Sequence, residues 1–273
     1  MNYKLLVVSV LFYFFLLPFN AVKNEESNAF QGKAYYMSKS TMDLGNFGAR
    51  FSEAQKKQIM ARLKGRLEKK FILTFNKQES MFYEESKLDA VSGATDSWGK
   101  NFAQGDQYKN TKNNEQIQNQ EFYGKNFLVK DVLQPIKWEM SAETKKIGKY
   151  ISYKATAVIP TNDLTWYSFS WDRIRNDGNK DEKKEVKMTK VEAWYTPQVP
   201  VSHGPSEYWG LPGLILEVSA GDTTLLCYKI VMNPEKKIEI KAPKKGKKVT
   251  KSEYQKIIST KMKEFRENRA GRR

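Results

Sequence analysis

Residues that carry most enzyme chemistry are scarce in this sequence. It has one cysteine, Cys227, and one histidine, His203, among 273 residues. A single cysteine excludes an intrachain disulfide and any site with two thiolate ligands, and a single histidine excludes a metal cage of several imidazoles. We therefore predict no metal site and no cofactor.

Patterns typical of nucleophilic or acid–base catalysis are also missing. A Ser-His-Asp triad would need His203, whose neighbour Ser202 is a poor partner because adjacent side chains in an extended loop diverge. The sequence has no Gly-rich phosphate loop, no serine flanked by glycines and no paired spacing of acidic residues. Cys227 lies in the apolar run 225–231, which favours a small buried side chain in a strand over a nucleophile.

The N-terminus predicts export. Lys4 precedes an apolar run from Leu5 to Phe19, which suits a signal peptide and is short for a membrane-spanning helix. Cleavage after Ala21 and cleavage after Ala29 both stay open, and an uncleaved membrane anchor is the alternative. We expect a periplasmic protein or one associated with the outer surface of the cell.

The remaining chain has the composition of a folded domain. The full sequence is 40% hydrophobic and 13% aromatic, with only nine prolines. We predict a signal peptide over residues 1–21, one β domain over residues 30–249 and a basic helix over residues 250–273. The oligomeric state does not follow from the sequence.

The positive charge is concentrated near the C-terminus. The chain has a net charge of +16, and residues 236–273 contain 15 Lys and Arg against four Glu. Such a tail can bind an anionic membrane surface or nucleic acid. Because an exported protein seldom meets nucleic acid, we predict no nucleic-acid partner and retain the membrane surface as a candidate partner.

Two segments have the pattern of amphipathic helices. Ser52 and Gln55 form a predicted capping box for a helix that ends near Lys69. Thr250 and Glu253 form another, followed by apolar residues at helical spacing from Tyr254 onward. This C-terminal helix either docks on the sheet or lies on a membrane. Docking is favoured, because the apolar stripe is narrow and has no tryptophan.

Most other apolar segments predict antiparallel strands, because many alternate apolar and polar residues. The predicted strands cover residues 33–38, 71–75, 80–84, 121–125, 126–129, 136–140, 150–158, 190–195, 214–218 and 225–231, with a further candidate at 236–240.

Two polar insertions interrupt the predicted strands. Residues 89–120 are rich in Asn, Gln, Gly, Lys and Asp, and we predict a long surface loop there. Residues 176–187 superficially resemble a calcium loop. Glu182 stands where that loop needs glycine and Met188 where it needs a bidentate glutamate, so a polar hairpin tip is favoured.

The most distinctive segment runs from Tyr195 to Gly213 and contains four prolines and three glycines. A rigid connection of this length between two strands is often functional. Pro212 and Gly213 fit the centre of a type II turn, in which the glycine takes a positive φ, and this turn would start the strand 214–218.

The motif and its surroundings resemble the GLPGLI family of exported bacterial proteins. The resemblance rests on residues 193–197, 199–202, 204–205 and 208–218, and extends to residues 143–148 and to the basic C-terminal helix. It implies a mainly antiparallel β fold similar to the curved half-barrel of bacterial lipoprotein carriers. It implies no reaction, because the family has no assigned catalytic residues.

Aromatic side chains near this motif are candidates for lining an apolar groove. The candidate binding or structural residues are Trp194, Tyr195, Pro197, Pro200, His203, Pro205, Tyr208, Trp209, Gly210, Leu211, Pro212, Gly213, Leu214 and Ile215.

Two functions remain open. The first is a non-enzymatic binding protein for an apolar ligand, a peptide or an envelope partner. The alternative is an envelope enzyme, a hydrolase or isomerase, with unidentified catalytic residues. An apolar cavity beneath residues 196–213 would favour binding. Acidic or serine side chains that meet His203 in one cleft would favour catalysis.

Overall fold

The computed structural model describes residues 30–41, 50–85, 101–169 and 186–270. The proposed leader over residues 1–21, residues 89–100 of the predicted loop 89–120, and residues 176–185 of the predicted insertion 176–187 lie outside this part. Among the described residues, no helix is long and apolar enough to cross a membrane.

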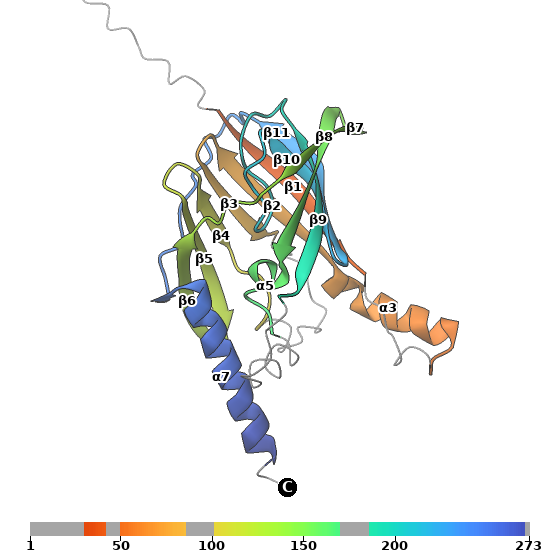
Figure 1. Ribbon diagram of the computed structural model, residues 1–273, viewed down its shortest axis with the longest axis vertical. Helices are drawn as coiled ribbons and strands as arrows, with labels where there is room; N and C mark the ends of the chain where they lie inside the picture. Colours follow the sequence, from red (N-terminus) through yellow and green to blue (C-terminus); the bar gives the residue numbers. More distant parts are fainter. Residues whose placement is uncertain (1–29, 42–49, 86–100, 170–185, 271–273) are drawn as a thin grey trace, which may run out of the picture.

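One mixed, mainly antiparallel sheet dominates the described residues (Figure 1). Its strands are β1 Gln31–Ser40, β2 Glu68–Asn76, β3 Glu79–Glu84, β4 Gln107–Asn110, β5 Glu115–Phe122, β6 Lys125–Val132, β7 Glu139–Ile147, β8 Tyr150–Pro160, β9 Met188–Thr196, β10 Leu214–Ala220, β11 Thr223–Met232 and β12 Lys247–Val249. The predicted fold class, a mainly β protein with a curved sheet and few helices, is confirmed.

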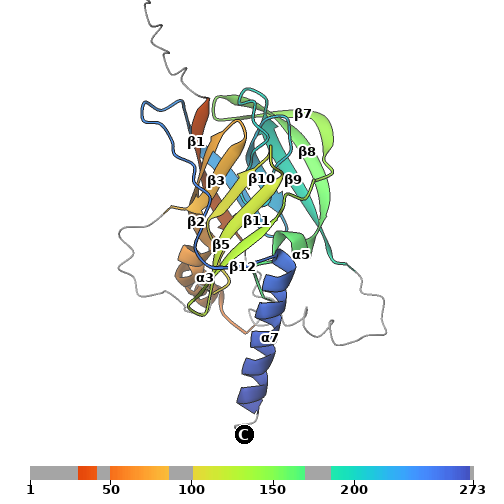
Figure 2. The same ribbon diagram turned by 90° about the vertical axis from the view of Figure 1, so that its left-hand side faces the viewer.

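The strands follow the order β12-β6-β5-β4-β3-β2-β1-β11-β10-β9-β8-β7. All neighbours pair antiparallel except β12, which runs parallel to β6. The sheet is open, with β12 and β7 at its edges, and it curls instead of lying flat (Figure 2).

Three described helices accompany the sheet. They are α3 Glu53–Leu67, α5 Thr161–Leu164 and α7 Lys251–Ala270. The predicted capping box of Ser52 and Gln55 is present at the start of α3. Helix α7 docks beside β6 and extends beyond the sheet (Figure 1). Its buried residues Tyr254, Ile258 and Met262 pack with Phe122 and Phe127 of the sheet.

The connection between β9 and β10, residues 197–213, fills the inside of the curved sheet. Val199, Val201, Tyr208 and Leu211 belong to the main hydrophobic core. The same connection contacts β4 through Lys109, although β4 and β10 are separated by four strands in the sheet order. A loop can bridge such distant strands only if the sheet curves around it. We call residues 197–213 the plug loop.

The prediction of a surface loop over residues 89–120 is wrong for its second half. Residues 107–110 and 115–120 form β4 and most of β5, and Gln107, Gln116, Gln118 and Gln120 are buried. The prediction failed because it assumed that polar residues lie at the surface. Here the glutamine amides pair with one another and with the plug loop, which removes the cost of burying them.

The turn before β10 also differs from the prediction. Gly210, and not Gly213, has a positive φ, of 92°. The Gly213 N–H donates to the Leu211 carbonyl over 2.8 Å, which closes a tighter turn around Pro212. Glycine is needed at position 213 for space, because a Cβ there would lie 2.3 Å from the Thr196 carbonyl oxygen.

Strand assignments near the ends of the sheet also differ from the prediction. The strand predicted over residues 136–140 begins only at Glu139 and continues to Ile147 as β7. Residues 236–240 are not a strand, and the last strand is β12 at Lys247–Val249. The predicted strands 121–125 and 126–129 are divided earlier than expected, by a two-residue turn at Tyr123 and Gly124, so that Phe122 pairs with Lys125.

Candidate functional site

Lys109 of β4 holds the plug loop in place. Its ammonium donates to the carbonyl oxygens of Gly204 at 2.8 Å, Ser206 at 2.6 Å and Tyr208 at 3.2 Å. The residue is 1% exposed, so water cannot replace these bonds. Three buried carbonyl groups that a loop would otherwise leave unpaired are thus satisfied by one side chain.

Burial lowers the pKa of Lys109 to about 7. The nearby Glu207 carboxylate opposes this shift, and the Lys251 ammonium adds to it. In the unfolded chain the ordinary lysine pKa is about 10.4. The folded and unfolded states therefore bind different numbers of protons between these two values.

We expect this difference to appear in the pH dependence of stability. Between pH 7 and pH 9 the unfolded state binds more protons at Lys109 than the folded state, so the lysine contribution to stability increases with pH. Below pH 7 both states are protonated and the contribution is constant. The slope is at most about 1.4 kcal/mol per pH unit. The measurement is urea unfolding of the wild type and of Lys109→Met over this range.

Other groups also change the pH dependence of stability; burial raises the pKa of Cys227 to about 12, for example. Because these groups are present in both proteins, the difference in unfolding free energy between wild type and variant reports Lys109 alone. We expect this difference in unfolding free energy to increase from pH 7 to pH 9. A difference that stays constant or decreases would contradict the lowered pKa of Lys109.

Glu207 of the plug loop is the centre of a second polar cluster. Its carboxylate accepts from Gln107 Nε2 at 2.7 Å, Gln116 Nε2 at 3.0 Å and Trp166 Nε1 at 2.9 Å. It also forms an ion pair of 2.8 Å with Lys251. The plug loop is thus tied to β4, to β5, to the segment after α5 and to the start of α7.

The first residue of α7 completes this cluster. Lys251 Nζ donates to Gln116 Oε1 at 2.9 Å and lies 5.3 Å from the centre of the Trp166 ring. Its backbone N–H donates to Asp131 Oδ2 at 3.1 Å. Helix α7 therefore begins at a fixed point on the sheet, where four chain segments meet.

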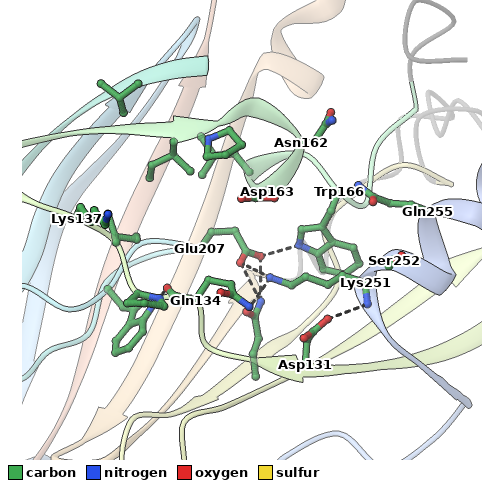
Figure 3. A pocket seen from close by; sticks show the side chains of 18 residues that line it. Asp131, Gln134, Lys137, Asn162, Asp163, Trp166, Glu207, Lys251, Ser252 and Gln255 are labelled. Carbon is green, nitrogen blue, oxygen red and sulfur yellow. Dashed lines mark hydrogen bonds and ion pairs between the residues drawn. The ribbon is translucent and has the colours of Figure 1, made fainter. Parts of the chain in front are cut away.

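A pocket of about 480 Å³ opens beside this cluster (Figure 3). Its wall combines β8 and α5 with the segment 134–137, the plug loop and the first turn of α7. Amide, carboxylate and ammonium groups alternate with apolar atoms along the wall. The polar lining residues are Gln116, Asp131, Gln134, Lys137, Asn162, Asp163, Glu207, Lys251, Ser252 and Gln255.

Asp163 presents an open carboxylate to this pocket. Within the part of the chain that the structure describes, no group donates a hydrogen bond to it, whereas the oxygens of Glu207 are occupied by protein donors. Partial burial raises the pKa of Asp163; Lys251 opposes the shift and Glu207 adds to it. Asp163 is the acidic group of the pocket that is free to accept from a ligand.

His203 does not reach the pocket. It is fully buried, and its Nε2 donates to the Asn76 carbonyl over 3.1 Å. Burial, assisted by the Lys109 charge, lowers the pKa of His203 to about 3, so the ring is neutral at pH 7. Cys227 is buried in β11 as predicted. The described residues also contain no group of three His, Cys, Asp or Glu side chains arranged to hold a metal ion.

The structure separates the residues that the sequence grouped as candidates. Trp209 lines the pocket, and its Nε1 donates to the Gln134 carbonyl. Trp194 lies on the opposite face of β9 from Tyr195, with Lys145 at 4.2 Å from its ring centre. The core contains Tyr195, Tyr208, Leu211, Leu214 and Ile215. Pro205 and Gly213 are also buried, whereas Pro197, Pro200, Gly210 and Pro212 are exposed.

Sequence reasoning missed the polar residues that build the site. Glu207 lies inside the segment 195–213, but the features that mark this segment in the sequence are its aromatic residues, prolines and glycines. Lys109 and Gln116 lie in the segment interpreted as a surface loop. The alternation of Gln116, Gln118 and Gln120 was the available signal, since it places three amides on one face of a strand.

A family model matches the middle of the chain. Residues 138–217 match the family described as "Protein of unknown function (Porph_ging)". The matched segment runs from the start of β7 into β10 and includes the whole plug loop. No curated protein matches the chain.

Two solved structures are similar to the chain in their architecture. The "Structure of PNGF-II in C2 space group" has a TM-score of 0.48 and 15% identity, covering 84% of this chain and 33% of that one. The structure of PNGF-II in the P21 space group has a TM-score of 0.42 and 16% identity, covering 79% and 29%. The chain spans about a third of the length of these proteins, and a similarity this distant carries no function across.

Proposed function

We propose that this chain is an exported, non-enzymatic binding protein of the GLPGLI type, and that its pocket binds a short peptide segment of an envelope partner. The observation that carries the proposal is the pocket beside the plug loop. Polar side chains and the indole of Trp209 line it, and hydrogen bonds to Glu207 and to the Gln134 carbonyl hold its walls in place. Ligand sites are commonly concave and preformed in this way.

The lining favours a peptide over an apolar ligand. The inside of the curved sheet, where an apolar ligand would sit, is occupied by Val199, Val201, Tyr208 and Leu211 of the plug loop itself. The remaining hollow presents amides from Gln134 and Asn162, which match the alternating donors and acceptors of a peptide backbone. The open Asp163 carboxylate suits a lysine or arginine side chain of the ligand.

A hydrolase is the second candidate, and the raised pKa of Asp163 beside the Glu207 carboxylate favours it. Glu207 is ill suited to act as a base or nucleophile there, because Gln107, Gln116, Trp166 and Lys251 already occupy its oxygens. Binding without chemistry therefore accounts better for the arrangement.

Export is part of the proposal and is tested separately. Lys4 and the apolar run from Leu5 to Phe19 support removal of a leader. Fractionation of cells that produce the full chain with a C-terminal tag should recover a shortened protein outside the cytoplasm. Its N-terminal sequence would distinguish cleavage after Ala21 from cleavage after Ala29, and recovery of an intact cytoplasmic chain would refute export.

Peptide binding can be tested by photo-crosslinking from the pocket. We expect a photoreactive amino acid at Lys137, in the full chain produced in its native host, to cross-link a reproducible set of peptides that mass spectrometry can identify. The double variant Trp209→Ala and Asp163→Asn should reduce these cross-links at least about tenfold, since it removes the stacking surface and the cation acceptor.

The matched control changes one aromatic residue and one aspartate outside the pocket. Tyr228→Ala and Asp222→Asn alter an exposed aromatic residue and an exposed acid on or beside β11, and should leave the cross-links unchanged. Lipids recovered alone, or equal cross-linking by the pocket variant, would overturn the peptide proposal. A cross-linked peptide cleaved by wild type but not by Asp163→Asn would favour the hydrolase.

A further inference from the structure

A second concave surface lies between α7 and the turn that joins β5 to β6. It has a volume of about 910 Å³ and shares no lining residue with the pocket beside the plug loop. One wall is the hairpin around Tyr123, and the other is the middle of α7. We call this surface the helix–hairpin groove.

The rim of the groove is strongly basic. Lys125 and Lys247 stand on the sheet side, and Lys256 and Lys261 on the helix side. The one acidic lining residue, Glu264, is already paired with Lys261 at 2.9 Å. Within the described chain, no ion pair involves Lys125, Lys247 or Lys256, and all three are exposed. The Glu253 carboxylate, which is hydrogen-bonded to Thr250, interacts electrostatically with Lys247 and Lys256 and offsets part of their charge. The three ammonium groups still form no direct ion pair among the described residues and can contact one anionic partner from both walls.

The floor of the groove is apolar. Phe122, Phe127 and Ile257 line it, and the first two are packed against the buried side of α7. An occupant with charged groups alone would leave this floor unused. The surface suits a ligand that combines negative charge with an apolar or aromatic side chain.

Tyr123 adds an exposed aromatic ring at the edge of the floor. It has a φ of 47° in a two-residue turn with Gly124, a backbone conformation in which asparagine or glycine is usual. Its ring meets Phe265 of α7 edge-on at 5.0 Å and is still 39% exposed. Tyr123 thus keeps its partly exposed ring at the opening of the helix–hairpin groove although its positive φ is unfavourable for tyrosine.

A flat membrane fits this surface poorly. An interfacial helix needs a free apolar face, and the apolar stripe of α7, Tyr254, Ile258 and Met262, is buried against the sheet. A bilayer surface could touch the lysines at the rim and would not reach the concave floor. A peptide segment can enter the groove and reach both.

From charge complementarity and the apolar floor, we infer that the helix–hairpin groove is a docking site for an acidic peptide segment of a partner protein, anchored by an aromatic or aliphatic side chain. The inference is independent of the proposed function of the other pocket. It assigns a local role to part of the basic C-terminal region.

The test measures binding of the full-length mature protein to a fluorescein-labelled peptide of glutamates interspersed with phenylalanines, by fluorescence anisotropy. Affinity should fall at least about tenfold between about 0.02 M and about 0.3 M salt, because the charges at the rim are exposed. The double variant Lys125→Glu and Lys256→Glu, with one change on each wall, should bind at least about tenfold more weakly than wild type.

A matched variant separates local from global charge. Lys112→Glu and Lys190→Glu change the net charge equally on exposed residues outside the groove, and should reduce affinity less than about threefold. Tyr123→Asn preserves the turn, because asparagine tolerates its backbone conformation, and should also weaken binding.

Three results would overturn the inference. One is equal weakening by the groove variant and the matched variant. Another is equally tight binding of a peptide of glutamates interspersed with serines, which would show that the floor is not used. The third is no binding of the acidic peptide, with or without binding to vesicles of phosphatidylglycerol. Thermal unfolding of each variant checks that the fold is retained.

Discussion

Replacing Lys109 by methionine is expected to lower the free energy of unfolding by about 3–5 kcal/mol, the largest effect we foresee for a single substitution, because each buried acceptor left unpaired costs about 1–3 kcal/mol and removal of the buried ammonium offsets only part of the sum. Methionine fills the space but cannot donate, so the carbonyl groups of Gly204, Ser206 and Tyr208 lose their partner inside the protein. For a domain of this size the expected decrease in Tm is on the order of 10 °C. Urea and thermal unfolding followed by circular dichroism measure it.

Lys112→Met is the control for this experiment. Lys112 lies in the exposed turn between β4 and β5, and its replacement should change stability by less than about 0.5 kcal/mol. If Lys109→Met cost no more than this control, the plug loop would have to be held by its apolar residues alone. Limited proteolysis within residues 197–213 gives a second measurement, since the variant should be cleaved there faster than wild type.

Glu207→Gln is expected to lower the free energy of unfolding by about 3 kcal/mol. The two side chains have the same shape, but the amide NH₂ would face one of the donors that now meet an oxygen, Trp166 Nε1, Lys251 Nζ or the glutamine amides. The substitution also leaves the Lys251 ammonium, 18% exposed, without its carboxylate. Denaturant unfolding measures the loss, and peptide cross-linking from Lys137 should decrease as the pocket loosens.

A double-mutant cycle separates the ion pair from the other bonds of Glu207. Lys251→Met alone and together with Glu207→Gln should give a coupling energy of about 1–3 kcal/mol, since the two groups lie 2.8 Å apart and are largely buried. Glu264→Gln breaks an exposed pair with Lys261 and should cost less than about 0.5 kcal/mol. A coupling energy near zero would show that the pair does not hold α7 to the plug loop.

Local patterns were sufficient to predict much of the fold. Alternating or continuous apolar residues identified β1, β2, β3 and β8 close to their observed bounds, because one face of each strand is buried whatever the partner strand is. The Ser52 capping box identified the start of α3, since its two hydrogen bonds join residues three apart in the chain.

The same patterns failed where polar residues are buried. β4 contains Lys109 and Gln107, and β5 contains alternating glutamines, so neither has a hydrophobic face in the sequence. Their burial is favourable because their partners, Glu207 and the carbonyl groups of the plug loop, lie nearly a hundred residues away in the chain. No window of local sequence contains both members of these pairs.

The candidate site shows the same division. The length and the proline content of the plug loop marked it as unusual, and Trp209 within it does line the pocket. The other members of the pocket come from β5, β6, β8, α5, α7 and the connecting segments 134–137 and 165–166, which meet only because the sheet curls around the loop. The sequence therefore predicted a segment that contributes one wall of the candidate pocket, and tertiary packing supplied the other walls.

The sequence by itself determined the β class of the fold, the two main helices, the inert burial of Cys227 and the absence of any familiar catalytic pattern, because each of these depends on residue type or on neighbours a few positions apart. Only the tertiary structure decided that the plug loop fills the sheet, that Lys109 and Glu207 hold it, and that α7 docks with its apolar stripe inward. The reason is physical: burying a charged or amide side chain is stable only when distant groups complete its hydrogen bonds.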